Sequence, residues 1–292
     1  PFWSRFGKKD GFLGRGNRPV PVCLAVDPKG VFLLPGAAMG GMGGSLLDEK
    51  GSYLMIIYGE NGDFTQEFLR ENSMGPNPLR MLEELLTQQP ISPGARVLDL
   101  GCGRGITSMY LAKVCKARVF ALDLWIQAVE NYQRFLAAGL GDAIVPLHGD
   151  ANALPFAQEY FDTLVCVDAY HYFGRTPGVM DEKIAPFVKP GGHILLAIPG
   201  MVRDIHGDIP AAMLRSWSPE DLDTIHDAQW WGRLLAGEHR VKVERIWPMA
   251  CYEQAWAEWL ACDNPYAIGD RAAMEAGASQ YMNLLGIVLK RI

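Results

Sequence analysis

The chain has 292 residues, of which 49% are hydrophobic, and a formal net charge of −6 at pH 7. This length suits one domain with additions or two small domains, and the apolar content can supply a sizeable core. The acidic balance and the lack of a basic stripe argue against a nucleic-acid substrate. No apolar run approaches the ~20 residues needed to span a bilayer.

The six cysteines are scattered, without a C-x-x-C pair or a spacing typical of a zinc site. We therefore expect no bound metal and a reducing, cytoplasmic environment. Cys102, Cys115 and Cys166 lie in apolar stretches and are predicted to be small core residues.

The first 52 residues are rich in Gly and Pro and show no sustained hydrophobic period. We predict a flexible extension over residues 1–52, because such a stretch buries too little apolar surface to offset its ordering entropy. A lid or a partner-binding arm is the alternative. Residues 53–292 form the predicted folded domain, in which Asn77 and Pro78 begin a helix as N-cap and first residue.

A buried strand, a glycine turn and a helix start follow one another over residues 96–112. Gly101, Gly103 and Gly105 suit a tight turn in which a ligand approaches bare backbone. A dinucleotide site requires G-x-G-x-x-G. The observed G-x-G-x-G, preceded by Asp99, disfavours a pyrophosphate and favours a ligand with an amino group or a positive charge. A glycine-rich loop without a ligand is the alternative.

Further strands are predicted over residues 119–123, 143–147, 161–168, 188–196, 241–247 and 281–289. The second of the chain's strands ends in Asp123, 24 residues after Asp99, where nucleotide-binding folds place an acid that binds ribose. The helix that follows is expected to turn Ile126, Val129, Phe135 and Leu136 inward.

Several segments together resemble the class I S-adenosylmethionine (SAM)-dependent methyltransferases. The resemblance covers Leu79 to Ile292 and is carried by D-L-G-C-G-R-G at 99–105, A-L-D-L-W at 121–125, H-G-D-A-N-A-L-P-F at 148–156, F-D-T-L-V at 161–165 and V-K-P-G-G at 188–192. The chain is most similar in appearance to the quinone-biosynthesis C-methyltransferases, the cyclopropane-fatty-acid-synthase-like group and unassigned bacterial methyltransferases. The resemblance implies a doubly wound, mostly parallel seven-stranded α/β sheet with an antiparallel last strand. It also implies a helical cover insertion at about residues 199–240.

The same resemblance implies a SAM site. In the family, the residue matching Asp123 binds the ribose hydroxyls, and those matching Asp150 and Ala151 meet the adenine. Trp125 either packs near the adenine or belongs to the core. The predicted cofactor-binding residues are Asp99, Gly101, Gly103, Gly105, Asp123, Leu124, Asp150, Ala151 and Asp168.

The acceptor of such enzymes lies at the carboxyl end of the fourth strand, which here leads into D-A-Y-H-Y-F-G at 168–174. His171 is the predicted catalytic base, with Tyr170 beside it, because an unperturbed imidazole pKa near 6.5 suits proton removal at neutral pH. A buried, hydrogen-bonded histidine is the alternative. The other predicted substrate-pocket residues are Met74, Tyr172, His226, Trp230 and Trp231.

The predicted function is methyl transfer from SAM to a small-molecule acceptor, with S-adenosyl-L-homocysteine as product. The acceptor atom is not readable from the chain, and the oligomeric state stays open, a homodimer included. Two rival functions remain: an NAD(P)-dependent oxidoreductase and a non-catalytic SAM-binding protein.

Overall fold

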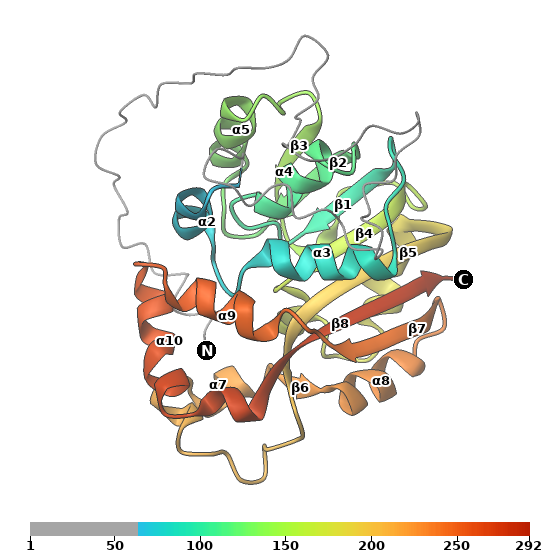
Figure 1. Cartoon of the computed structure of the whole chain (residues 1–292). Coiled ribbons are helices and arrows are strands. Elements are labelled where there is room, and N and C mark those ends of the chain that lie inside the picture. Colours follow the sequence, from blue (N-terminus) through green and yellow to red (C-terminus); the bar gives the residue numbers. More distant parts are fainter. Residues whose placement is uncertain (1–63) are drawn as a thin grey trace, which may run out of the picture.

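The computed structural model describes residues 64–292 as an α/β fold (Figure 1). The predicted extension over residues 1–52 and the first residues of the predicted domain lie outside the described part. Within residues 64–292, no helix is both long and apolar enough to cross a membrane.

One sheet organises the molecule, with strand order β3-β2-β1-β4-β5-β8-β7 and the two-residue β6 paired with β5. Strand β8 runs antiparallel to both of its neighbours, whereas the other pairings are parallel. The predicted mostly parallel sheet with an antiparallel last strand is thereby confirmed. The strands are β1 (Arg96–Leu100), β2 (Arg118–Asp123), β3 (Ile144–His148), β4 (Phe161–Val167), β5 (Val188–Met201), β6 (His226–Asp227), β7 (Val241–Pro248) and β8 (Met282–Arg291).

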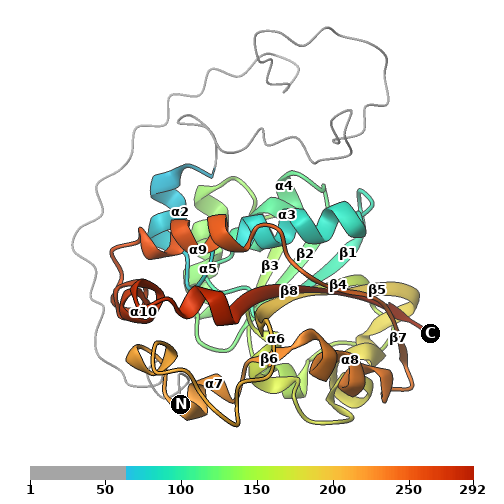
Figure 2. The same ribbon diagram turned by 60° about the horizontal axis from the view of Figure 1, so that its bottom comes forward.

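Helices cover both faces of the sheet. Figure 2 shows α2, α3, α4, α5 and α9 on one side and α6, α7 and α8 on the other. The helices are α2 (Gln66–Asn72), α3 (Pro78–Gln88), α4 (Ile106–Lys113), α5 (Ala128–Ala137), α6 (Tyr170–Phe173), α7 (Pro219–Leu222), α8 (Ala228–Ala236), α9 (Tyr252–Leu260) and α10 (Pro265–Glu275). Short 3-10 or π turns are η1 (Ala151–Ala153), η2 (Met180–Ile184), η3 (Ala185–Phe187), η4 (Met213–Arg215) and η5 (Ala278–Tyr281).

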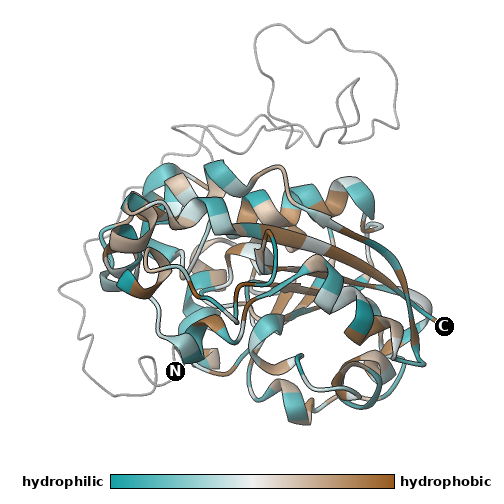
Figure 3. Cartoon of the chain, turned by 90° about the horizontal axis from the view of Figure 1, so that it is seen from below, coloured by the Kyte–Doolittle hydropathy of each residue, from teal (hydrophilic) through white to brown (hydrophobic). Residues whose placement is uncertain are grey.

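Strand alternation divides the core into two layers. Along β1, Val97 packs with α3 and α4, whereas Leu98 and Leu100 pack with the residues of the opposite face. This period of two places apolar side chains on both faces, as a sheet covered by helices on both sides requires. The strands form the apolar band in the middle of Figure 3, with the more polar surfaces of the helices around it.

The inward face of α5 differs from the prediction. Phe135 is buried as expected, but Val129 and Leu136 are 64% and 47% exposed. Asn131 is buried instead, and its Nδ2 donates a hydrogen bond to the carbonyl oxygen of Gly103 at 2.9 Å. The helix packs against the glycine loop as well as the sheet. The loop offers an unpaired carbonyl, which a polar side chain satisfies and an apolar one cannot.

The two parts of the predicted cover insertion pack in different places. Residues 202–240 contain η4, α7, β6 and α8, and α8 packs along β7. A third apolar cluster joins the segment around α7 to α9 and α10, with Trp217, Trp256 and Trp259 among its buried members. This cluster lies beyond the end of the sheet and closes one side of the cavity described below.

The observed orientation of α5, with Asn131 buried and Val129 exposed, can be tested by measuring the free energy of unfolding. We expect Asn131→Ala to lower the free energy of unfolding by about 1–3 kcal/mol, because it leaves the Gly103 carbonyl without its partner. The exposed Val129→Ala on the same helix should change it by no more than about 0.5 kcal/mol. Urea unfolding measures both. Equal effects of the two substitutions would contradict the observed orientation of the helix.

Candidate functional site

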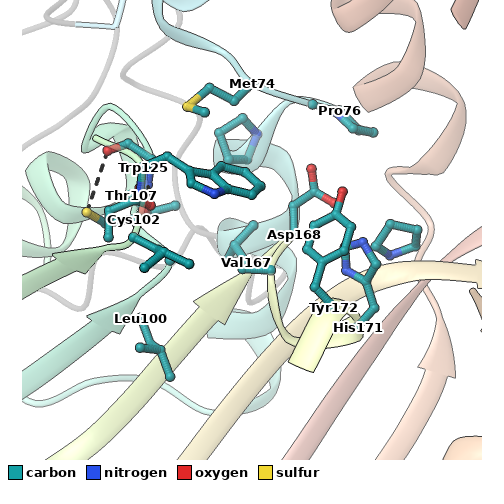
Figure 4. Close-up of a pocket in the computed structure, with 18 of the residues that line it drawn as sticks. Met74, Pro76, Leu100, Cys102, Thr107, Trp125, Val167, Asp168, His171 and Tyr172 are labelled. Atoms are coloured by element: carbon teal, nitrogen blue, oxygen red, sulfur yellow. Dashed lines mark hydrogen bonds between the residues drawn. The ribbon is translucent and has the colours of Figure 1, made fainter. Parts of the chain in front are cut away.

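A cavity of about 380 Å³ opens at the carboxyl ends of β1, β2 and β4 (Figure 4). The strand order reverses between β1 and β4, and open α/β sheets bind their ligands at such a switch point. The volume lies in the range of about 300–1,000 Å³ that is typical of small-molecule sites.

The glycine loop after β1 forms one wall. Gly101 and Gly103 have φ of +75° and +53°, and a Cβ on Gly101 would lie 2.4 Å from the Cβ of Ala169. A Cβ on Gly103 would lie 3.1 Å from the Sδ of Met74. Both positions therefore require glycine, because a side chain would collide with Ala169 or crowd Met74 and would be strained at a positive φ. The backbone of the loop consequently lines the cavity without side chains at these two positions. Gly105 is the N-cap residue of α4 and is not among the residues lining the cavity.

Asp99 lies beneath this loop. It is 1% exposed, and its Oδ2 accepts hydrogen bonds from Thr107 Oγ1 at 2.6 Å and Ser108 Oγ at 2.5 Å. Burial raises the pKa of the carboxyl to about 6. Asp99 does not line the cavity. Its visible role is to fix the first turn of α4, and its predicted contact with the cofactor stays a prediction.

Asp123 ends β2 and faces the cavity. Its Oδ2 accepts a hydrogen bond from the Gly103 amide at 2.8 Å, and its Oδ1 accepts from the amides of Trp125 and Ile126, both at 2.8 Å. Since a carboxylate has about four lone-pair positions, Oδ2 retains capacity for a ligand hydroxyl. The carboxylate thus ties two loops together while remaining available at the cavity wall.

The segment after β3 forms the adjoining wall. Asp150 is exposed toward the cavity, and its Oδ1 accepts from the backbone and side-chain nitrogens of Asn152 at 2.8 and 2.9 Å. Ala151, Leu124 and Trp125 also line the cavity. The structure brings these predicted residues together with Asp123, Gly101 and Gly103.

Asp168 follows β4 and adopts a left-handed φ of +58°. Burial, reinforced by the charge of Asp270, raises the pKa of Asp168 to about 8. Gly75 approaches this carboxyl closely: a Cβ there would lie 2.0 Å from Asp168 Oδ2. Met74, Gly75 and Pro76 all line the cavity, so the loop before α3 forms its roof opposite Asp168 (Figure 4).

His171 and Tyr170, the predicted catalytic pair, have different environments. His171 lines the cavity and its ring centroid lies 3.8 Å from that of Tyr172, but burial and the charge of Arg175 lower its pKa to about 3. A neutral imidazole with so low a pKa is a weak base at neutral pH. Its catalytic role stays a prediction that this environment weakens. Tyr170 does not line the cavity, because its ring packs in the core against Phe173 and Trp231.

The predicted substrate-pocket residues divide in the same way. Met74 and Tyr172 line the cavity. His226, Trp230 and Trp231 do not: His226 stacks on Trp230 with ring centroids 3.7 Å apart, and Trp231 is fully buried beneath the sheet. Neither of the adjacent tryptophans reaches the cavity, since α8 packs along β7 and away from the switch point.

The wall of the cavity opposite the glycine loop is lined by a different set of side chains, and we call this wall the tryptophan side. Sequence reasoning missed most of them, because they come from three segments far apart in the chain and share no motif. A cluster of tryptophans among C-terminal helices is the only signal for them in the sequence. The tryptophan side comprises Asp168, Tyr172, Trp217, Asp221, Thr224, Ile225, Trp256, Trp259, Asp270 and Met282.

Known proteins resemble the chain most clearly at the glycine-loop side. Residues 97–192 match a family model described as a methyltransferase domain. A stretch of 139 residues is 30% identical to the methyltransferase GfsG of Streptomyces halstedii, covering 47% of this chain and 49% of that protein. A stretch of 121 residues is 31% identical to the glycine/sarcosine/dimethylglycine N-methyltransferase of Actinopolyspora halophila, covering 41% and 21%. The chain thus spans less than half the length of these curated relatives.

The fold has solved counterparts. The crystal structure of geranyl diphosphate C-methyltransferase from Streptomyces coelicolor A3(2), in complex with Mg²⁺, geranyl diphosphate and S-adenosyl-L-homocysteine, superposes with a TM-score of 0.56. It is 16% identical and covers 78% of each chain. At this identity the likeness establishes the fold alone, and it confirms the predicted Rossmann-like methyltransferase architecture.

The environment of Asp168 predicts a pH-dependent stability. In the folded chain its carboxyl keeps a proton up to about pH 8, whereas the ordinary pKa is 3.8. The wild-type protein therefore loses stability as the pH rises between these values. Asp168→Asn, which tolerates the left-handed backbone, should raise the free energy of unfolding at about pH 8 by roughly 1–3 kcal/mol. The gain should shrink as the pH falls toward about 5.

Urea unfolding at several pH values measures this difference. The exposed Asp208→Asn serves as a matched control, because it removes the same charge outside the cavity. A gain from Asp168→Asn that stays constant between about pH 5 and 8 would contradict the assigned protonation.

Proposed function

We propose that this chain, whose residues 97–192 belong to the methyltransferase domain family, binds SAM and transfers its methyl group to a small-molecule acceptor. The observation that carries the proposal is a single cavity with two chemically different walls. The glycine-loop side offers open backbone and the Asp123 carboxylate, and the tryptophan side extends the cavity beyond them.

The residues present fit the cofactor. The Asp123 carboxylate suits the ribose hydroxyls, because it faces the cavity and charged hydrogen bonds are the stronger class. Asp150 and the Ala151 amide suit the polar edge of an adenine, with Leu124 and Trp125 as apolar neighbours. The bare backbone of Gly101 and Gly103, which line the cavity, suits the amino-acid end of the cofactor.

Bound SAM would supply an already activated methyl group on a positively charged sulfur. The chain's contribution is then to hold both reactants in line and to exclude water, which can supply a large part of the rate enhancement. Met74 and Pro76 cover the cavity from above, while Asp168 and Tyr172 stand where its two walls meet (Figure 4).

This arrangement favours methyl transfer over the two rival functions. A dinucleotide requires the G-x-G-x-x-G loop, whereas this chain has G-x-G-x-G. A dinucleotide also requires room for a second nucleotide, whereas the tryptophan side of this cavity carries tryptophans and carboxylates. A protein that only binds the cofactor has no need for a second, chemically distinct wall. The glycine/sarcosine/dimethylglycine N-methyltransferase and the geranyl diphosphate C-methyltransferase differ, by their names, in acceptor: one is named for amines and the other for geranyl diphosphate at carbon. They leave the acceptor of this chain open.

Calorimetry tests the proposal directly. We expect SAM and S-adenosyl-L-homocysteine to bind in the micromolar range and NAD not to bind. Asp123→Ala should weaken SAM binding by about 1.5–3 kcal/mol, because it removes the charge-assisted hydrogen bond that Oδ2 can still accept. Asp142→Ala, an exposed aspartate outside the cavity, should leave binding unchanged.

Thermal unfolding of each variant shows whether the fold is intact. Binding of NAD without SAM would overturn the proposed class. Wild-type SAM affinity in folded Asp123→Ala would overturn the ribose assignment while leaving the class in place.

A further inference from the structure

The charges lining the cavity have one dominant sign. Among the described residues that line it, the formally charged side chains are Arg104 and five aspartates, at positions 123, 150, 168, 221 and 270. Arg104 lies in the glycine loop, and its Nη1 donates to the Glu71 carbonyl. The tryptophan side carries three of the aspartates and, within the described residues, neither a lysine nor an arginine.

Asp270 is held in place by two indoles. Its Oδ1 accepts a hydrogen bond from Trp217 Nε1 and its Oδ2 from Trp259 Nε1, both at 2.9 Å. These bonds come from two different segments and fix the carboxylate rigidly at the cavity wall. Its charge reaches Asp168, whose pKa it helps to raise. The two carboxyls therefore face a common space.

Asp221 supplies an independent sign of a ligand. The residue is 7% exposed and lines the cavity. Its Oδ2 accepts from the amide and hydroxyl of Ser218, both at 3.0 Å. Its Oδ1 is buried and has no hydrogen-bond partner among the described residues. A buried, unpartnered carboxylate oxygen is costly, so this atom is suited to accept a bond from a bound molecule.

Aromatic rings complete the wall. Trp217 and Trp256 pack edge to face with ring centroids 6.1 Å apart, and Trp259 and Tyr172 line the same side. Faces of such rings attract cations within about 6 Å. A metal ion is a poor match, because no group of three or more His, Cys, Asp or Glu residues in the described part is arranged to hold one. An anionic acceptor would be repelled by the carboxylates.

We propose that the tryptophan side binds a small organic amine as the methyl acceptor, with its cationic nitrogen held by Asp221, Asp270 and the indole rings. The inference rests on the proposed methyl transfer and adds the substrate class. Recognition combines charge with aromatic contact, which together select a substituted ammonium over a neutral alcohol or a carboxylic acid.

Methyl transfer to the amine forms one nitrogen–carbon bond, breaks one carbon–sulfur bond and releases one proton. The ammonium form of the acceptor first releases one proton to solvent water, because Asp168 keeps its own proton up to about pH 8 and does not accept another at neutral pH. The freed lone pair on nitrogen forms the new bond to the methyl carbon. The carbon–sulfur bond breaks, its electron pair stays on sulfur and the sulfur becomes uncharged. The products are the methylated ammonium and S-adenosyl-L-homocysteine, with one proton released to solvent.

Binding of a matched pair of probes tests the proposal without turnover. Choline carries a quaternary ammonium that cannot be methylated, and 3,3-dimethylbutan-1-ol is its uncharged carbon isostere. Titrated into the protein with saturating S-adenosyl-L-homocysteine, choline should bind at least about tenfold more tightly than the isostere. Asp221→Asn and Asp270→Asn should each weaken choline at least about tenfold and leave the isostere unchanged. Asp208→Asn should alter neither probe.

The two proposals fail in distinguishable ways. Failure of the wild type to bind SAM or S-adenosyl-L-homocysteine would overturn the methyl-transfer function. Normal binding of S-adenosyl-L-homocysteine with equal affinity for choline and its isostere would overturn the amine proposal alone. Asp270→Asn disturbs the two indole hydrogen bonds and can lower the stability of the fold. Asp221 makes neither of these bonds, so Asp221→Asn tests the proposal even if Asp270→Asn does not fold. Incubation with labelled SAM and a panel of amines, phenols and carboxylic acids gives a second readout. Label on nitrogen is expected, and transfer only to oxygen or carbon would contradict the proposal.

Discussion

The carboxylate of Asp123 is the interaction on which the site depends. It joins the glycine loop after β1 to the start of the segment that leads into α5 through three backbone hydrogen bonds. These bonds hold both loops at the switch point of the sheet, where no regular secondary structure would satisfy their amides. Asn131 supports the same loop from α5 by satisfying the Gly103 carbonyl. A surface of polar backbone is thereby kept rigid and open toward a cavity.

The second half of the site depends on a different kind of constraint. The cover formed by α7, α9 and α10 lies beyond the end of the sheet and has its own apolar cluster. Asp270 links this cluster internally through Trp217 and Trp259, so one carboxylate serves both packing and the cavity wall. Asp168 belongs to the part of the chain that matches the methyltransferase domain model, and it lines the cavity together with residues of this cover.

Local sequence patterns predicted the sheet well, because each strand is a short apolar run and each turn is marked by Gly, Pro or Asp. The glycine-loop side of the cavity was equally predictable, since Asp123, Asp150 and Gly101 belong to contiguous motifs at strand ends. The tryptophan side was not. Trp230 and Trp231 were predicted to line the pocket because they lie in the cover insertion, where adjacent side chains point to different faces. Packing of α8 against β7 instead turns both away from the cavity. Asp221 and Asp270 are ordinary helix residues in the sequence, and only the tertiary fold brings them to one wall.

A crystal structure of the protein with S-adenosyl-L-homocysteine tests the central claim most directly. We predict ribose hydroxyls on the Asp123 carboxylate, the adenine beside Asp150 and Ala151, and the sulfur facing the tryptophan side. A ligand bound elsewhere, or one whose sulfur points away from Asp168 and the tryptophan side, would contradict the proposed methyl transfer.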